Sequence, residues 1–178
     1  HSLGAMKTRD ALPSDALAIA SAQVASWQVA YRHLLPADWL ASMSVSERCS
    51  RWEEIIGQGQ SDVQVALQAG SVIGFASSGK SRDEDAEPNT HELFALYVHP
   101  GAWSQGHGWN LWQSVLESAK RLGAGRCALW AIVGNDRGTK FYERLGFTVQ
   151  HGSRQSFEIA GVPLQEDRYV LALSPNGA

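Results

Sequence analysis

Apolar residues recur every three or four positions in two stretches near the start of the chain, as in amphipathic helices. After Ser14, a residue type that caps helices, the stripe consists of Leu17, Ala20, Val24, Trp27 and Tyr31. After Ser44, which forms a capping-box pattern with Glu47, the stripe consists of Val45, Cys49, Trp52 and Ile56 and stops at Gly57. The pattern predicts two leading helices.

Alternating and continuous apolar runs predict strands in the middle of the chain. Residues 62–68 alternate, turn at Ala69-Gly70 and return along 72–76, which predicts a hairpin. Continuous runs at 91–98 and 126–133 predict buried strands. A loop at 99–106 separates them, followed by a helical stripe made of Trp109, Trp112, Val115, Leu116 and Ala119.

A short helix and a closing hairpin complete the predicted order of elements. Asn135 or Asp136 caps a helix that presents Phe141, Tyr142 and Leu145 on one face and ends at Gly146. Segments 147–159 and 165–173 flank a turn. We predict an α/β (α+β) fold with one mixed, mostly antiparallel sheet of about seven strands and helices on both faces.

Composition narrows the class of protein. The 178 residues are 44% hydrophobic and 19% charged with a net charge of −3, which indicates one globular domain over residues 6–178 and is less basic than nucleic-acid binders usually are. No apolar run approaches the ~20 residues that cross a bilayer. His1–Ala5, ahead of Met6, is interpreted as an expression-tag remnant.

The cysteines and histidines carry no metal or disulfide pattern. Cys49 and Cys127 are far apart, which suits a reducing cytoplasm. His99, His107 and His151 lack the spacing of metal ligands, so no metal is expected. Neither nucleic acid nor membrane is an expected partner.

Residues 74–81 match the G-x-x-x-x-G-K-[ST] pattern of a nucleotide-binding P-loop. Phosphate binding by that motif needs a following helix, whereas residues 81–90 are polar and contain Asp83, Glu84, Asp85 and Glu87. We therefore predict a hairpin strand that ends in an exposed acidic loop. A P-loop phosphotransferase that uses Lys80 is the remote alternative.

A second candidate phosphate site lies between a predicted strand and a predicted helix. It is the run Trp103-Ser104-Gln105-Gly106-His107-Gly108. Glycine lets a ligand approach the backbone, and the amides at a helix N-terminus attract phosphate. The run predicts a pyrophosphate cradle, and its alternative is an ordinary glycine-rich turn.

Four signatures in sequence order resemble the GNAT superfamily of acyl-CoA-dependent N-acetyltransferases. They are residues 92–100 (ELFALYVHP), residues 105–108 (QGHG), Asn135-Asp136 and residues 141–147 (FYERLGF). The resemblance covers essentially residues 6–173. The family loop begins with Gln or Arg, and here Trp103 stands at that position.

The resemblance implies that acetyl-CoA is the cosubstrate and that the acetyl group passes directly to a primary amine in a ternary complex. Strand residues Leu96, Tyr97 and Val98 would pair with the pantetheine arm, and the Val98 N–H would stabilise the oxyanion. The diphosphate would bind at residues 103–108. A non-catalytic acyl-CoA sensor on the same fold is the alternative from another class.

Three side chains have both a chemical and a structural interpretation. Glu92 is a general base for the ammonium or part of a structural ion pair. Tyr142 protonates the leaving thiolate or is a packed aromatic residue. Asn135 hydrogen-bonds the pantetheine amides or caps a helix.

The acceptor is expected on the side of the two leading helices and the closing hairpin. Trp27, Tyr31 and Trp52 would wall its pocket beside Glu92, and the acidic loop would attract a cationic amine. The sequence leaves open whether the acceptor is a small molecule or a peptide. An exposed tryptophan would permit a homodimer.

Overall fold

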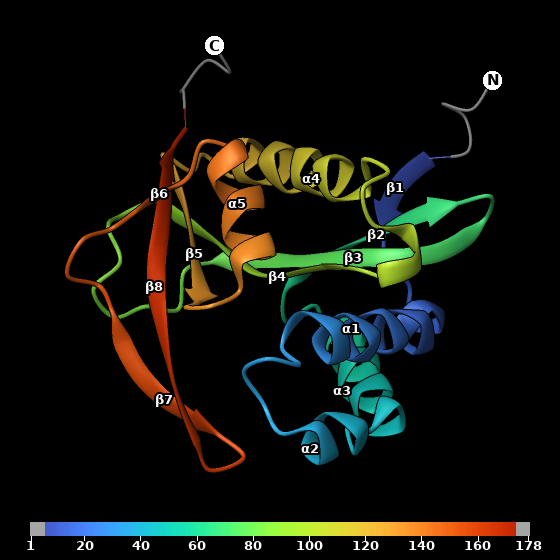
Figure 1. The fold of residues 1–178 in the computed structure, drawn as a ribbon. Coiled ribbons are helices and arrows are strands. Elements are labelled where there is room, and N and C mark those ends of the chain that lie inside the picture. The colour runs from blue at the N-terminus through green and yellow to red at the C-terminus, as the bar shows by residue number, and fades with distance from the viewer. Residues whose placement is uncertain (1–5, 174–178) are drawn as a thin grey trace.

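The computed structural model describes residues 6–173, and one eight-stranded sheet runs through them (Figure 1). The strands are β1 (Met6–Asp10), β2 (Asp62–Gln68), β3 (Ser71–Lys80), β4 (Thr90–Val98), β5 (Arg126–Ile132), β6 (Thr148–Val149), β7 (Gln155–Ile159) and β8 (Val162–Ala172). The helices are α1 (Ala16–Ala30), α2 (Ala37–Ala41), α3 (Val45–Gly57), α4 (His107–Arg121) and α5 (Asp136–Arg144). The predicted tag remnant, His1–Ala5, lies outside the described residues.

The strand order is β1-β2-β3-β4-β5-β8-β6, and β7 pairs with β8 beyond this path. All pairs are antiparallel except β4 with β5. This confirms the predicted fold class, with eight strands in place of about seven. No helix in the described part of the chain is long and apolar enough to cross a membrane.

Helices cover both faces of the sheet, and each face has its own core. Figure 1 shows α4 and α5 on one side and α1, α2 and α3 on the other. On the α4 side the rings of Trp112 and Phe147 meet at 5.2 Å, and on the α1 side those of Trp52 and Phe75 meet at 4.9 Å. The sheet therefore separates two packed layers.

Both predicted leading helices, α1 and α3, form, but the prediction was wrong about which side of α1 is buried. Ser44 Oγ accepts a hydrogen bond from Glu47 N at 3.1 Å, so the predicted cap of α3 is confirmed. Leu17, predicted to be buried, is 60% exposed, whereas Ala16 and Ile19 are buried. Because α1 is apolar on most of its surface, its periodicity did not identify which side faces the sheet.

The structure differs from the prediction in three places. β1 and the short α2 were not predicted. The segment 147–159 was predicted as one strand, but it divides into β6 and β7, which pair with different halves of β8. Between them Gly152 has a positive φ of 80°, and Ser153 Oγ bonds Gln150 O and Arg168 N. This turn redirects the chain.

The acidic loop is exposed, as predicted, but two of its carboxylates fasten it to the sheet. Arg168 is 7% exposed and pairs with Asp83 at 3.2 Å and with Asp85 at 2.7 Å. Asp83 also accepts a hydrogen bond from Trp130 Nε1 at 3.1 Å. Glu84 is exposed. Half of the predicted negative charge is thus paired within the protein.

Candidate active site

Strands β4 and β5 separate beside a large cavity. They pair at three positions, which end with Glu92 opposite Ala128. Beyond that pair, residues 93–98 and 129–132 line a cavity of about 1060 Å³. Small-molecule pockets usually span about 300–1,000 Å³, so this cavity has room for a large ligand or for two ligands.

The free edge of β4 presents main-chain groups to this gap. His99 N donates to a carbonyl oxygen of β3 at 2.7 Å. Because amides alternate in direction along a strand, those of Leu96 and Val98 point toward the gap. Val98 O accepts hydrogen bonds from Ser26 Oγ and from Trp103 Nε1, both at 2.7 Å. The Val98 N–H therefore has the direction expected of an oxyanion donor.

The N-terminus of α4 forms an open cradle at one end of the cavity. Gly106 is its N-cap with a φ of 90°, and no side chain caps the helix. The amides of Gly106, His107, Gly108 and Trp109 have no partner within the helix, because the first four never do. A Cβ on Gly106 would meet no atom within 4 Å. These amides and the helix dipole suit an anion.

A guanidinium completes the cradle from another helix. Arg137 on α5 lies over the ring of Trp103, with Cζ 4.2 Å from the ring centre, and its Nη2 donates to Ser104 Oγ at 3.3 Å. All three residues line the cavity. Trp103 thus holds the Arg137 guanidinium at the position where the family loop begins with Gln or Arg. Arg137 was missed because it lies 33 residues beyond Ser104.

Asn135 and Tyr142 both line the cavity. Asn135 Oδ1 accepts from Gly138 N at 3.2 Å, which confirms the helix cap, and its Nδ2 donates to the Tyr31 hydroxyl at 3.2 Å. Tyr142 packs 6.2 Å from the ring of Phe147, and burial raises the pKa of its hydroxyl above the ordinary value. Tyr142 is therefore both a packed aromatic residue and part of the cavity lining.

The structure does not bring Glu92 to the cavity. Its Oε1 accepts hydrogen bonds from Ser81 Oγ and Arg82 N, both at 3.1 Å, and the cavity lining does not include it. A bulge in β4 changes which residues share a face, because Ser77 pairs with Ala95 whereas Ser78 pairs with Leu93. Leu93 and Leu96 consequently pack in the same core, so simple alternation misplaced Glu92.

Two other predicted site residues also lie elsewhere. Trp52 is 7% exposed, packs on Phe75 and donates from Nε1 to Gln23 Oε1 at 2.9 Å, so it belongs to the core and not to the acceptor wall. Gln105 does not line the cavity, and its Oε1 accepts a hydrogen bond from Gln68 Nε2. The remaining predicted positions line the cavity, namely Trp27, Tyr31, Leu96, Tyr97, Val98, Trp103, Ser104, Gly106, His107, Gly108, Asn135 and Tyr142.

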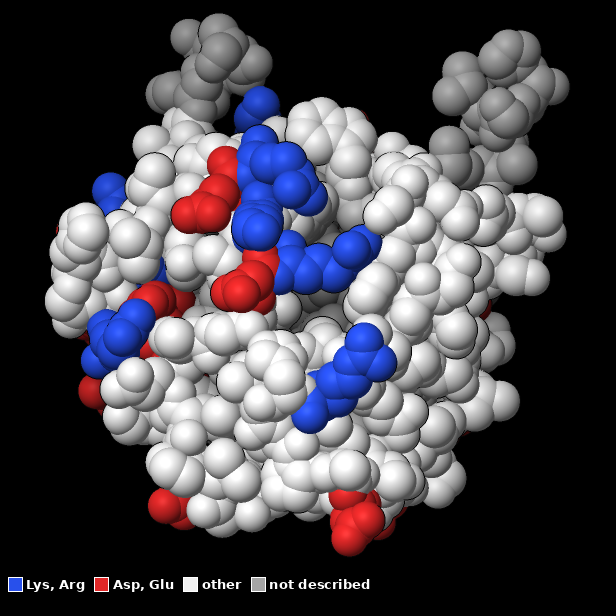
Figure 2. All heavy atoms as spheres, in the orientation of Figure 1, with Lys and Arg blue, Asp and Glu red and all other residues white. Residues whose placement is uncertain are grey.

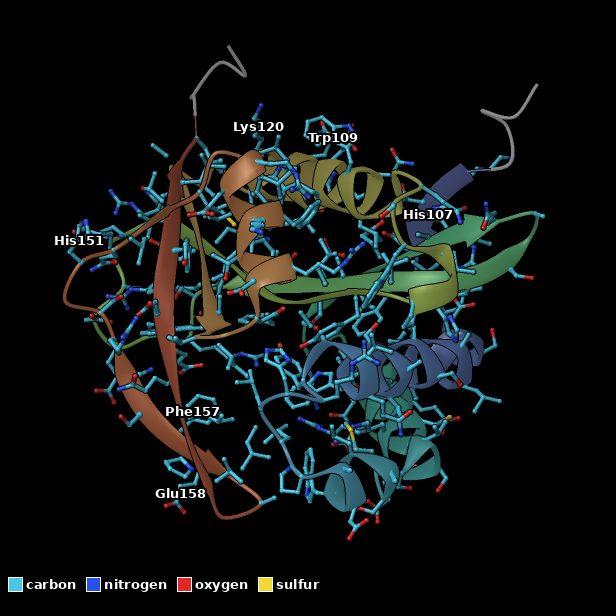
Figure 3. The ribbon with its side chains drawn as sticks, in the orientation of Figure 1. His107, Trp109, Lys120, His151, Phe157 and Glu158 are labelled. Atoms are coloured by element: carbon cyan, nitrogen blue, oxygen red, sulfur yellow. The ribbon has the colours of Figure 1, made fainter. Side chains whose placement is uncertain are left out.

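The end of the cavity opposite the cradle is built from residues that sequence reasoning did not select. They are Phe94, Trp130, Ile132, Phe157, Ile159 and Glu166. They come from β4, β5, β7 and β8, and no local motif links them. Figure 3 labels Phe157 on β7. Figure 2 shows a hollow between α5 and α1, bordered by basic side chains.

The competing phosphate motif forms a strand. Residues 74–80 lie in β3, and the loop after Lys80 leads into β4 without a helix. Lys80 does not line the cavity. The predicted hairpin strand is confirmed.

Within residues 6–173, no group of three or more His, Cys, Asp or Glu is placed to hold a metal ion.

Comparison with known proteins identifies relatives along most of the chain. Residues 24–147 match the model of the Acetyltransferase (GNAT) family. The uncharacterised N-acetyltransferase YuaI of Bacillus subtilis (strain 168) is 33% identical over 159 residues, which cover 89% of this chain and 88% of YuaI.

Solved structures share the fold. The yncA protein of Salmonella typhimurium, solved with its cofactor acetyl-CoA, is 26% identical with a TM-score of 0.69, and the match covers 98% of this chain and 97% of that one. The paia N-acetyltransferase of Thermoplasma acidophilum in complex with coenzyme A is 20% identical with a TM-score of 0.70, over 92% and 99% of the two chains. The family match, the 33% identity to YuaI and the divergence of β4 from β5 agree, and the chain belongs to the GNAT acetyltransferase family.

Proposed function

We propose that this protein transfers an acetyl group from acetyl-CoA directly to a primary amine while both substrates are bound. The observation that carries the proposal is one continuous cavity that joins the amide cradle, the free edge of β4 and an apolar end beneath α1. Such a cavity can hold the coenzyme and the acceptor together, which direct transfer requires.

The residues of one end fit acetyl-CoA. The amides at the start of α4 and the guanidinium of Arg137 suit its diphosphate. The amides of Leu96 and Val98 can pair with the pantetheine arm. In this arrangement we expect the thioester carbonyl to lie near the Val98 N–H, and a single such donor is worth about 10²–10³ in rate.

The positions of the two cysteines also favour direct transfer over a covalent acetyl-cysteine intermediate. Neither Cys49 nor Cys127 lines the cavity, and burial raises the pKa of Cys127 to about 12, which makes it a poor nucleophile. The free amine attacks the carbonyl carbon, the C–S bond breaks, and the Tyr142 hydroxyl gives a proton to the thiolate.

Calorimetry with acetyl-CoA and with MgATP in parallel, followed by a thiol-release assay on a panel of amines, tests the proposal. We expect acetyl-CoA to bind, MgATP not to bind, and thiol release to depend on the amine. Binding of acetyl-CoA without release for any amine would indicate a sensor. Binding of MgATP that Lys80→Ala abolishes would support the P-loop alternative.

A further inference from the structure

The end of the cavity away from the cradle is mainly aromatic and aliphatic. Trp27 and Tyr31 of α1 lie with ring centres 4.5 Å apart, and Ile132, Phe157 and Ile159 pack in the same cluster as Tyr31. All five line the cavity. A ligand portion bound here is therefore apolar.

One carboxylate stands in this apolar wall. Glu166 on β8 pairs across the sheet with Ile132 on one side and with Gln155 on the other. Directly paired residues project from the same face, so Glu166 shares the cavity-facing side of the sheet with Ile132. Among the described residues that line the cavity, Glu166 is the one acidic side chain.

Glu166 has hydrogen-bonding capacity left over. Gln155 Nε2 donates to its Oε1 at 3.1 Å, and no ion pair in residues 6–173 includes it. Two nearby arginines are engaged elsewhere. Arg168 on β8 pairs with Asp83 and Asp85, and Arg154, which directly precedes β7, pairs with Asp167. A half-buried carboxylate without a cation is costly, so the site favours a cationic ligand.

Partial burial and the negative charge of Asp83 both raise the pKa of Glu166 above its ordinary value. A carboxyl group with a raised pKa is a better proton acceptor than an exposed one. The same charge at Asp83 makes the surroundings of Glu166 more favourable to a cation and less favourable to an anion.

The charges in the cavity are divided between its ends. The two arginines that line it, Arg137 and Arg144, both belong to α5, and Arg137 contacts the cradle. The aromatic end offers Glu166 and no lining cation among the described residues. An acceptor with its own carboxylate would find no partner there and would be repelled by Glu166.

We propose that Glu166 is the catalytic residue that binds the acceptor ammonium and takes its proton, and that the acceptor is a primary amine with a compact apolar or aromatic body and no carboxylate. This inference rests on the proposed function. It replaces Glu92, which the structure holds outside the cavity.

Atoms and charge balance in this transfer. The Glu166 carboxylate takes one proton from R–NH₃⁺, and the lone pair of R–NH₂ forms a C–N bond with the thioester carbonyl carbon. The C–S bond then breaks, and the thiolate is protonated by Tyr142, which recovers a proton from the nitrogen. Glu166 releases its proton to solvent, so the products are R–NH–acetyl, free thiol and one H⁺.

Phenethylamine and phenylalanine form a matched pair of probes that differ by one carboxylate. With acetyl-CoA and the wild-type protein, we expect kcat/KM for phenethylamine to exceed that for phenylalanine by about 100-fold. Glu166→Gln keeps the size of the side chain, and we expect it to lower kcat/KM for phenethylamine by about 10²-fold or more, within the range of general base catalysis.

Glu158→Gln is the control, because Glu158 is exposed on the neighbouring strand and adjacent to Phe157 on the opposite face (Figure 3). We expect this variant to match the wild type, and both variants to retain acetyl-CoA affinity by calorimetry, which shows that Glu166→Gln is folded.

The outcomes separate the inference from the proposed function. Equal use of phenylalanine, acetylation confined to amines that bear a carboxylate, or full activity of Glu166→Gln would overturn the inference and leave the acetyltransferase intact. If the wild-type protein binds acetyl-CoA but releases thiol with no amine, the proposed function fails instead.

Discussion

The two ends of the cavity are built on different principles. The end proposed to bind the coenzyme consists mainly of main-chain amides from one continuous stretch, the end of β4 and the start of α4. The end proposed to bind the acceptor consists of side chains from α1, β4, β5, β7 and β8, which are distant in the sequence. The first end is therefore sensitive to backbone conformation, and the second is sensitive to individual side chains.

The largest effect is expected where the cradle backbone is changed. Gly106→Val forces a β-branched residue into a φ of 90° and adds atoms over the open amides. We expect at least a ~100-fold weaker affinity for acetyl-CoA in calorimetry, because hydrogen bonds to the charged diphosphate are each worth about 1.5–3 kcal/mol.

Gly123→Val is the matched control at the other end of α4. Gly123 has a φ of 76°, and a Cβ added to it, as at Gly106, would meet no atom within 4 Å. Both variants should lose about 1–3 kcal/mol of stability through backbone strain, but only the change at Gly106 should affect the coenzyme. An equal loss of affinity in both would show that the cradle does not bind it.

Tyr142→Phe tests a side chain at the junction of the two ends. A thiolate leaves readily, so we expect kcat to fall about 10-fold, less than strong acid catalysis provides, with unchanged acetyl-CoA affinity. Tyr169→Phe removes a hydroxyl from the same core cluster but not from the cavity, and it should retain full activity. If Tyr142→Phe turned over at the wild-type rate at every pH, Tyr142 would have only a packing role and no role in proton transfer.

Arg137→Ala tests the one side-chain cation that contacts the cradle among the described residues. We expect the Kd for acetyl-CoA to rise about 10-fold and its salt dependence to weaken, as for loss of one charge-assisted contact. Lys140→Ala on the same helix is the control, since Lys140 is exposed and does not line the cavity. If both variants weakened acetyl-CoA binding equally, the overall positive charge of α5 would matter and the specific contact of Arg137 would not.

The smallest effect is expected from the acidic loop. Asp83 and Asp85 are paired with Arg168, which leaves Glu84 and Glu87 exposed. The double variant Glu84→Gln/Glu87→Gln should change kcat/KM for a cationic amine by less than about two-fold, because exposed charges contribute little. A larger loss of kcat/KM, together with a weaker dependence of kcat/KM on salt, would support the hypothesis that this loop attracts the amine electrostatically.

The contrast between the ends also explains what the sequence could predict. The loop 103–108 and the strand before it could be selected as candidates because their residues are adjacent in the sequence, and all of the selected positions except Gln105 line the cavity. The cap at Asn135 followed from local propensity. Glu92 was misplaced because alternation does not reveal a bulge. Trp52 was misassigned to the acceptor pocket because an apolar stripe on a helix has the same spacing whether it packs in a core or lines a pocket.

Long-range pairing accounts for the residues that were missed. Arg137 reaches Ser104 only because α5 packs beside the start of α4, and Glu166 reaches the cavity only because β8 inserts next to β5. Neither position carries a local signal, since a lone charged residue on a helix or a strand is usually solvated.

The carbonyl oxygen of Val98 has a consequence for how this protein can be re-engineered. Its two lone pairs are both occupied, one by Ser26 from α1 and one by Trp103 from the loop that leads to α4. A single atom thus links α1 and the loop before α4 to the same strand, β4. A foreign first helix grafted to change acceptor preference must preserve a donor at position 26, or the end of β4 loses one of these two hydrogen bonds.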